Sequence, residues 1–227
     1  MTIAANLAAV RERIAAAARR VDRDESSVTL VAVSKTFGLD AIEGALAAGI
    51  TDLGENRAQE FKQKVAVVGQ RARWHFVGHL QTNKVRNVAG VSALIHSVDR
   101  FGLAEAIARR ASAMDVVQDV LIEVNVARDP KRHGVEPARA IALAAEVERL
   151  GSVTVRGLMG MAPFLDRPED ARPFFVELRE LGETLQPELG RDVHLSMGMT
   201  RDFEVAIEEG ATMVRVGEAI FGARHPR

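Results

Sequence analysis

Two residue types are missing from this 227-residue chain, and each absence excludes a kind of chemistry. Without cysteine, the protein has no disulfide, no thiol nucleophile and no thiolate metal site. Without tyrosine, it has no phenol to act as an acid or a base. Long apolar runs are missing too, and the charged residues Arg11, Glu12 and Arg13 interrupt the apolar start. We therefore expect a cytoplasmic protein that does not contact a membrane.

Neither sign of charge predominates, since 30 Lys and Arg residues against 31 Asp and Glu residues give a formal net charge of -1. With no basic block either, nothing indicates a nucleic-acid surface. The length and the 47% hydrophobic content fit one large α/β domain or two small ones. No linker or low-complexity segment divides the chain, so we expect a single domain over residues 1–227.

Short apolar segments alternate with helical patterns along the whole chain. The first, residues 28–33, is apolar or β-branched at every position, as in a strand buried on both faces. Strands are predicted at residues 28–33, 51–53, 74–77, 93–96, 117–124, 153–159, 193–195 and 213–216. Eight similar units with no obvious switch point favour an α/β fold that closes as a (β/α)8 TIM barrel, rather than a doubly wound open sheet.

Helical spacing predicts the remaining elements. An extra N-terminal helix runs from Ile3 to about Arg20, ahead of the first strand. A polar helix is predicted around residues 84–88. The helix after Pro168 presents an apolar face made of Phe174, Leu178, Leu181 and Leu185.

Candidate ligand-binding residues follow the predicted strands, at the end where barrels bind their ligands. Lys35 follows the first strand and shares a face with Val31 and Val33, although a solvated lysine opening a loop would stand there equally well. Short segments that contain glycine and hydroxyl residues follow the last two strands. They either hold a phosphate through backbone N–H groups and hydroxyls or simply shape tight turns; their residues are Ser196, Met197, Gly198, Thr200 and Gly217.

A lysine combined with a phosphate cradle predicts pyridoxal 5′-phosphate (PLP), an aldehyde that carries a phosphate. Lys35 would hold it covalently as a Schiff base. Arg215 lies two residues before Gly217 on the same side of its strand, within reach of the pyridine nitrogen. Because arginine cannot accept a proton, that nitrogen would stay neutral and the ring would be a weaker electron sink. No metal is expected, because the six histidines show no ligand-pair spacing.

Several motifs, spread in order over nearly the whole chain, resemble those of the pyridoxal phosphate homeostasis protein family. The block at residues 74–84 is the most specific of them. The motifs are AVSKT at 32–36, GENR at 54–57, WHFVGHLQTNK at 74–84, GLMGM at 157–161, LSMGM at 195–199 and VRVGEAIFG at 214–222.

This resemblance implies a barrel of the alanine racemase N-terminal type, without the extra β domain of that enzyme, and PLP on Lys35. It implies that Arg215 faces the ring nitrogen and Asn56 lines the ring pocket. It also implies that Ser196, Thr200 and Gly217 hold the phosphate. Met197 and Gly198 belong to the same cradle, and Met159 either pads the ring pocket or fills the core. The family usually has an acidic or small residue where this chain has Arg201, which either changes phosphate binding or pairs with Asp202.

Family members are regarded as carriers or regulators of PLP, so we expect storage, delivery or regulation of the cofactor without turnover. Transient contact with PLP-dependent apo-enzymes and a monomeric state are expected as well. The alternative is an enzyme, either a small PLP-dependent amino-acid racemase or a Schiff-base lyase. A two-base racemase of this barrel type uses a lysine and a tyrosine, and this chain has no tyrosine. His79 is a possible substitute base, although a structural histidine is the commoner case.

Overall fold

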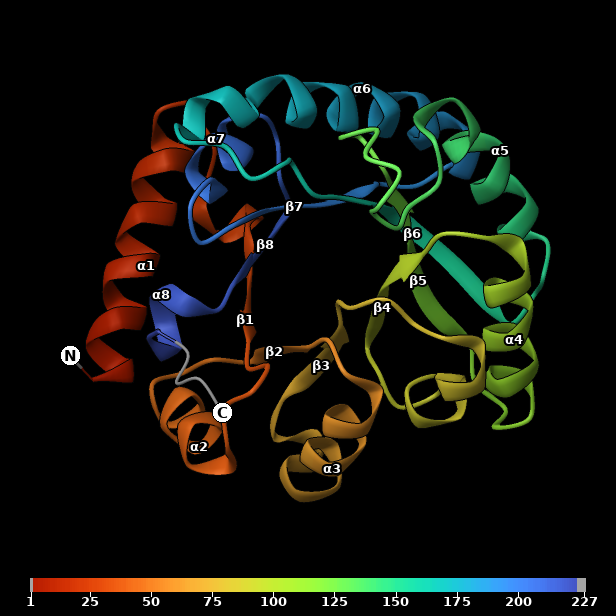
Figure 1. Ribbon diagram of the computed structural model, residues 1–227, viewed down its shortest axis with the longest axis horizontal. Helices are drawn as coiled ribbons and strands as arrows, with labels where there is room; N and C mark the ends of the chain where they lie inside the picture. The colour runs from red at the N-terminus through yellow and green to blue at the C-terminus, as the bar shows by residue number, and fades with distance from the viewer. Residues whose placement is uncertain (1, 224–227) are drawn as a thin grey trace.

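The computed structural model describes residues 2–223, which form a ring of strands inside a ring of helices (Figure 1). The strands of this range are β1 (Thr29–Val33), β2 (Asp52–Glu55), β3 (Arg73–Phe76), β4 (Leu94–Val98), β5 (Gln118–Val124), β6 (Val153–Gly160), β7 (His194–Met199) and β8 (Met213–Val216). Its α-helices are α1 (Ile3–Arg19), α2 (Leu39–Ala47), α3 (Ala58–Val68), α4 (Phe101–Ser112), α5 (Pro137–Glu148), α6 (Arg172–Leu189), α7 (Phe203–Glu208) and α8 (Glu218–Phe221). Short 3-10 helices are η1 (Glu25–Ser27), η2 (Gly69–Arg71), η3 (Thr82–Asn87) and η4 (Pro168–Ala171).

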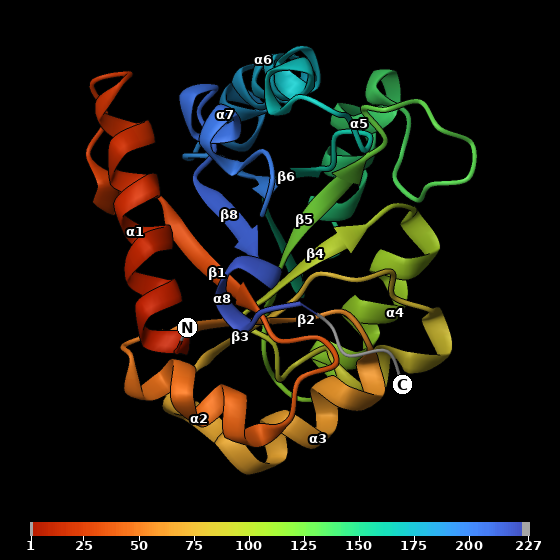
Figure 2. The same ribbon diagram turned by 60° about the vertical axis from the view of Figure 1, so that its left-hand side comes forward.

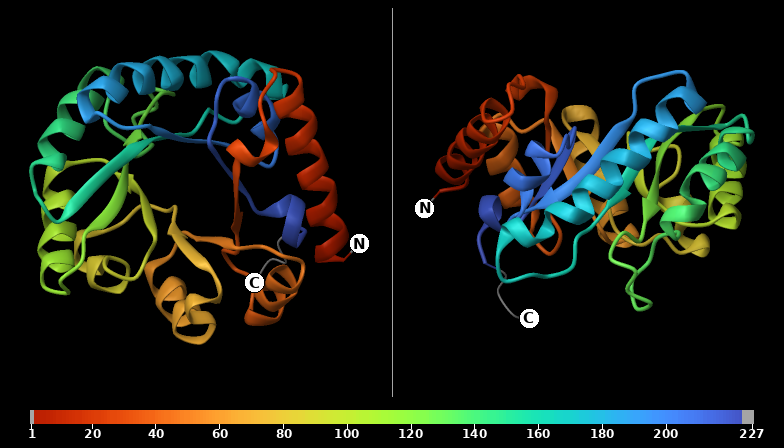
Figure 3. Two further views of the ribbon diagram at one scale, coloured as in Figure 1. Left: turned by 180° about the vertical axis from the view of Figure 1, so that it is seen from behind. Right: turned by 90° about the horizontal axis from the view of Figure 1, so that it is seen from above.

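The strands are parallel, follow sequence order around the ring and close it. Closure is made by β1 against β8, in a register that runs from Thr29 opposite Met213 to Ala32 opposite Val216. Figure 3 shows the same ring from behind and from above. The predicted (β/α)8 barrel is therefore confirmed, and the open-sheet alternative is wrong.

Both faces of the strands are buried, as their continuous apolar sequences predict. Inside the barrel, Leu94, Leu121, Met159 and Met213 form a small cluster. A much larger cluster fills the space between strands and helices, and it includes Ala32 of β1. Val31 and Val33 point to the other face, where both approach Gly54 of β2.

The extra N-terminal helix is confirmed as α1, which packs against α2, α7 and α8 (Figures 1 and 2). It buries a helical stripe that includes Leu7, Val10 and Ile14. Since α7 has six residues and α8 only four, α1 covers the outside of the barrel where β8 meets β1. Ion pairs join its polar side to α7, with Arg13 lying 2.8 Å from Glu204.

Three local predictions need correction. Strand β7 continues to Met199, so residues 196–198 lie within the strand and not in a loop after it. The polar helix predicted at 84–88 is the 3-10 helix η3. In α6 the fully buried aromatic ring belongs to Phe175 instead of Phe174. Gly182 is also buried on this face of α6. A Cβ there would meet Leu195 of β7 at 2.8 Å, so the glycine allows α6 to lie close to the sheet.

No helix within residues 2–223 is long and apolar enough to cross a membrane.

Candidate functional site: a cavity at the carboxyl ends of the strands

A cavity of about 640 Å³ lies at the carboxyl ends of the strands. Its volume is in the range of small-molecule sites. The structure brings five of the sequence-predicted residues together on its wall: Lys35, Asn56, Thr200, Arg215 and Gly217. These residues lie at the ends of β1, β2, β7 and β8, which are adjacent in the closed ring.

Lys35 stands where the chain leaves β1 and turns. The backbone N–H of Ser34 still donates to the carbonyl of Gly54 in β2 at 2.8 Å. Thr36 then takes a positive φ of 69°, a conformation that side-chain-bearing residues seldom adopt. Val33 and Lys35 both line the cavity, as the strand alternation predicts. The lysine therefore follows a rigid strand end, and its side chain faces the cavity.

A buried ion pair between Lys64 of α3 and Glu55 of β2 fixes the ends of β1 and β2. Lys64 Nζ also donates to the carbonyl of Ser34 at 2.8 Å, next to Lys35 in the chain. Glu55 Oε1 accepts from the backbone N–H of Asn56 at 2.7 Å. One charged pair thus holds the backbone on either side of the cavity's lysine and asparagine.

Asn56 presents a buried side-chain oxygen, Oδ1, that has no hydrogen-bond partner among the described residues. Such a group costs free energy unless a ligand or water satisfies it. The backbone of Asn56 lies directly under the turn after β3, since a Cβ on Gly78 would meet the Asn56 carbonyl oxygen at 2.2 Å. Only glycine fits there, and the close approach holds Asn56 in place.

Arg215 is buried inside the barrel mouth, with 5% of its surface exposed. Its Nη1 donates to Ser196 Oγ at 2.6 Å and its Nη2 donates to the carbonyl of Gly160 at 3.0 Å. Burial lowers the pKa of Arg215 to about 10, while Glu123 and Asp202 act in the opposite direction. The guanidinium is therefore cationic at neutral pH and is held by two neutral acceptors.

A chain of hydrogen bonds runs from Arg215 through the barrel interior to the amino end of β2. Ser196 Oγ lies 2.8 Å from His96 Nδ1, and His96 Nε2 lies 2.9 Å from His75 Nδ1. His75 Nε2 lies 2.9 Å from Asp52 Oδ1. Burial, His75 and Arg215 hold the pKa of His96 well below its usual range, so this ring is neutral.

Because the His96 ring is neutral, one of its two nitrogens donates a hydrogen bond and the other accepts one. Asp52 Oδ1 accepts from His75 Nε2, and the chain continues through the two ring nitrogens of His96 to Ser196 Oγ. Ser196 Oγ lies between His96 and Arg215, and it accepts from Arg215 Nη1 at 2.6 Å. Among the described residues Ser196 contacts Arg215 and does not line the cavity, and its role in holding a phosphate stays a sequence-based prediction.

The remaining three predicted residues reach the cavity only indirectly. Met159 belongs to the apolar cluster inside the barrel. Met197 is fully buried in the large cluster on the outer side of the strands. Gly198 has a φ of 89°, and a Cβ there would meet Phe203 Cα of α7 at 2.8 Å, so it is a close-packing position. None of the three lines the cavity.

Thr200 and Gly217 face the cavity from the ends of β7 and β8. Arg201, next to Thr200, lies on the ring of Phe164 at 4.3 Å and donates to the carbonyl of Asp166 at 3.2 Å. Asp202 has a different partner, since its carboxylate accepts from the backbone N–H of Met199 at 2.6 Å. Arg201 thus holds the segment after β6 against the cavity.

Glu123 of β5 is a cavity residue that sequence reasoning missed. Burial and the charge of Asp99 raise its pKa to about 7, although Arg215 acts to lower it. Its Oε2 is buried and has no hydrogen-bond partner among residues 2–223. Only its place in an alternating strand, one residue before the predicted strand end at Val124, signalled that it faces the interior.

The comparisons with known proteins agree with this architecture. The family model described as "Alanine racemase, N-terminal domain" matches residues 5–225. A protein of Aquifex aeolicus named "Pyridoxal phosphate homeostasis protein" is 47% identical over 226 residues, covering 99% of both chains. The chain belongs to the pyridoxal phosphate homeostasis protein family. An Escherichia coli member of this family is 40% identical over 232 residues, covering 98% of this chain and 97% of the relative.

Solved structures extend the comparison. The family member PipY of Synechococcus elongatus, solved with PLP bound, is similar with a TM-score of 0.83 and 34% identity, covering 97% of this chain and 100% of PipY. An alanine racemase of Clostridium difficile gives a TM-score of 0.74 at 13% identity, covering 96% of this chain and 60% of the racemase. This second likeness supports the shared barrel fold only.

Proposed function

We propose that the protein binds PLP covalently through Lys35 and acts in PLP homeostasis, by storing, delivering or regulating the cofactor without catalytic turnover. The observation that carries this proposal is that Lys35 and Arg215 face one cavity of about 640 Å³. The PLP-bound structure of PipY supports it by similarity. The cytoplasmic location and the monomeric state stay sequence-based predictions.

The residues of the cavity fit the cofactor. PLP supplies an aldehyde, which forms a Schiff base with a primary amine, and a phosphate dianion. Lys35 provides the amine, and the unpartnered Oδ1 of Asn56 shows a polar group that the described protein atoms leave unsatisfied. On the neighbouring strand ends, the Thr200 hydroxyl and the backbone N–H groups at Gly217 would hold the phosphate.

Arg215 favours a carrier over an enzyme. A guanidinium donates hydrogen bonds and accepts none, so a pyridine nitrogen beside it stays unprotonated. The bonds to Ser196 and Gly160 hold the guanidinium in this orientation. An unprotonated ring draws electrons weakly, which disfavours carbanion chemistry. The missing tyrosine removes the second base of a racemase as well.

Glu123 supports a second candidate, a weak PLP-dependent racemase or another Schiff-base enzyme. A carboxyl whose pKa is raised to about 7 can give and take protons near neutral pH. This group lies in the same cavity as Lys35. Incubation of the PLP-loaded protein with amino acids in deuterated water separates the two candidates. The carrier predicts no α-proton exchange that depends on Lys35 and Glu123, whereas the enzyme predicts exchange that Glu123→Gln slows.

Binding and delivery are tested by titration. PLP added to the wild-type protein is expected to give the visible absorbance of a bound Schiff base, and Lys35→Ala is expected to abolish it. Lys131→Ala is the matched control, because Lys131 lines the same cavity and should leave the absorbance unchanged. Delivery predicts that the loaded protein activates a PLP-dependent apo-enzyme. Equal spectra for wild type and Lys35→Ala would overturn the proposed attachment.

A further inference from the structure

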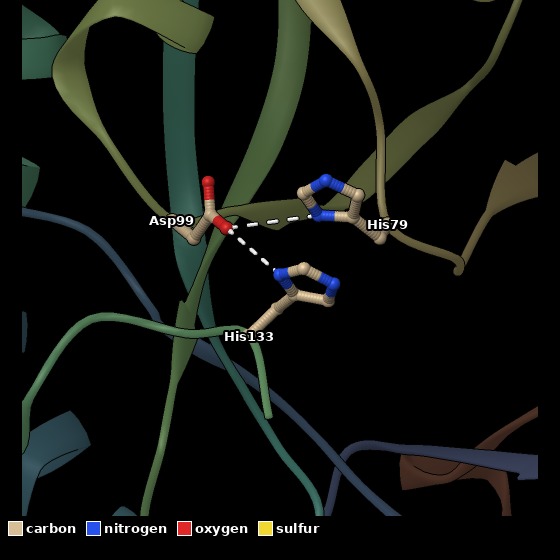
Figure 4. A group of neighbouring side chains, drawn as sticks. All are labelled: His79, Asp99 and His133. Atoms are coloured by element: carbon tan, nitrogen blue, oxygen red, sulfur yellow. Dashed lines mark ion pairs between the residues drawn. The ribbon is translucent and has the colours of Figure 1, made fainter. Parts of the chain in front are cut away.

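Three metal-binding side chains from different strand ends meet at the edge of the cavity (Figure 4). His79 follows β3, Asp99 follows β4, and His133 belongs to the loop after β5. Asp99 Oδ2 lies 3.7 Å from His79 Nδ1 and 3.9 Å from His133 Nδ1. The three ligand atoms lie within 4.8 Å of one another. Both ring nitrogens therefore face the same carboxylate oxygen.

These separations leave a gap that no protein hydrogen bond closes. His79 Nδ1 is buried and has no hydrogen-bond partner among the described residues. The other oxygen of the carboxylate, Asp99 Oδ1, accepts from Arg100 Nη1 at 2.6 Å. This contact fixes the carboxylate with Oδ2 toward the histidines. A ligand held by a neighbouring group in this way is typical of metal sites.

We propose that His79, Asp99 and His133 form a binding site for a divalent cation of the zinc class. Two imidazole nitrogens and one carboxylate oxygen are a donor set that zinc, cobalt and nickel accept. With metal–ligand distances of about 2.0–2.2 Å, two ligands at a tetrahedral angle stand about 3.3–3.6 Å apart. The observed 3.7 and 3.9 Å are slightly longer, so binding requires the ligands to move closer together and the two stacked rings to tilt.

The contraction falls on His133. Its ring stacks on that of His79 with centroids 3.5 Å apart and planes at 10°, so the rings must tilt for both lone pairs to reach one ion. The side chain of His133 is 54% exposed, which leaves it room to tilt.

An ion held here has an open position toward the cavity, because His79 and His133 both line the cavity wall. Three protein ligands with one open position are the arrangement of zinc sites that take up a further ligand. Arg100 and Lys131 oppose a cation by charge, whereas Glu123, which acts electrostatically on Asp99, favours one. The sequence-based prediction of no metal considered only pairs of histidines close together in the sequence. It could not detect this group, because its three ligands follow three different strands.

The site is tested by equilibrium dialysis of the full chain, freed of PLP, against Zn²⁺, with the bound metal counted by elemental analysis. Co²⁺ serves as a second probe, because its visible bands report tetrahedral coordination by nitrogen and oxygen. The variants are His133→Gln and Asp99→Asn, with His194→Gln as the matched control. His194 lies at the start of β7, and its Nδ1 is 3.4 Å from Thr212 Oγ1.

One Zn²⁺ per chain is expected in the wild type and in His194→Gln. His133→Gln and Asp99→Asn should weaken binding by at least about tenfold and remove the visible Co²⁺ bands. Because His133 is more than half exposed, its replacement leaves the fold intact, and circular dichroism checks this. Absence of stoichiometric Zn²⁺ binding would overturn the proposal. Equal affinity in wild type and His133→Gln, or an equal loss in His194→Gln, would do the same.

Discussion

The two sides of the cavity are held by opposite means. At the ends of β1 and β2, a buried ion pair of Lys64 with Glu55 fixes the backbone around Lys35. At the ends of β7 and β8, a chain of hydrogen bonds through Ser196 and the neutral ring of His96 fixes the side chain of Arg215. The first side contains two opposite charges in direct contact. On the second side, a chain of hydrogen bonds links the buried cation Arg215 to the distant carboxylate of Asp52.

This difference matches what each side must do. In the proposed function, Lys35 has to react with its ligand and release it, which requires a side chain that can move on a fixed backbone. The arginine only donates hydrogen bonds, so its side chain is the part that needs to be fixed. A buried network of this kind is stable only if every member is satisfied. The comparison therefore predicts different costs when the two sides are disturbed.

The largest effect is expected on the side of Lys35. Lys64→Met leaves the Glu55 carboxylate buried without its cation and should lower the free energy of unfolding by about 3–5 kcal/mol. Urea denaturation measures this loss. The double variant Lys64→Met with Glu55→Gln removes both charges and should recover part of the stability. If the single variant unfolds at the wild-type urea concentration, the ion pair does not fix this side.

The next largest effect is a change of stability with pH that depends on Glu123 of β5. Its pKa is raised to about 7 in the folded protein from 4.5, so the folded state holds its proton more tightly than the unfolded chain. Its contribution to stability is therefore present below pH 4.5 and is lost as the pH rises through about 7. Glu123→Gln removes this loss, and its stability relative to wild type should rise by up to about 3 kcal/mol between those pH values.

Urea denaturation at several pH values measures this difference. His96 acts with the opposite sign, because its pKa lies below its ordinary value of 6.5 and its contribution is lost as the pH falls below that value. Both proteins share that loss, so it cancels in the comparison. A constant difference between Glu123→Gln and wild type across the pH range would contradict the account of Glu123.

A smaller effect is expected when the chain of hydrogen bonds to Arg215 is broken. Ser196→Ala removes the hydroxyl between His96 and Arg215 and should cost about 1–3 kcal/mol of stability. PLP should also dissociate faster, because the guanidinium loses one of its two acceptors. Stopped-flow absorbance measures the rate.

Ser97→Ala is the matched control, since Ser97 is equally buried and its hydroxyl has no hydrogen-bond partner within residues 2–223. It should change neither the stability nor the PLP dissociation rate appreciably. If Ser196→Ala and Ser97→Ala behave alike, the hydrogen-bond chain does not position Arg215.

The smallest effect is expected at Arg201. Its guanidinium lies on Phe164 and bonds to the carbonyl of Asp166, at the rim of the cavity. Arg201→Gln should weaken PLP binding by only a few fold, consistent with a contact worth about 0.5–1 kcal/mol. Fluorescence titration measures the affinity. A loss as large as that of Lys35→Ala would show that Arg201 is a main phosphate ligand.

The barrel and the position of Lys35 at its ligand-binding end could be predicted because both depend on local sequence patterns. Apolar runs show strands, and Lys35 directly follows one of them. The helix α1 was equally clear from the spacing of Leu7, Val10 and Ile14. Boundaries in glycine-containing strands were not, because an alternating strand such as 194–199 reads like a turn when Gly198 interrupts it.

Pairings between distant residues were not predictable from the sequence. Nothing in the spacing of Glu55 and Lys64 shows that they meet, and Ser196 and His96 are brought together by ring closure across the barrel. The same holds for His79, Asp99 and His133. These contacts depend on which strands lie side by side and on which face each side chain takes, and only the closed ring supplies both.

The central claim, that Lys35 holds PLP covalently in this cavity, is tested most directly by trapping. PLP-loaded protein is reduced with borohydride, digested, and its peptides are mapped by mass spectrometry. We predict that one peptide carries the reduced pyridoxyl phosphate group, that the modified residue is Lys35, and that Lys131 is unmodified. A label on another lysine, or the same label yield in Lys35→Ala, would contradict the account.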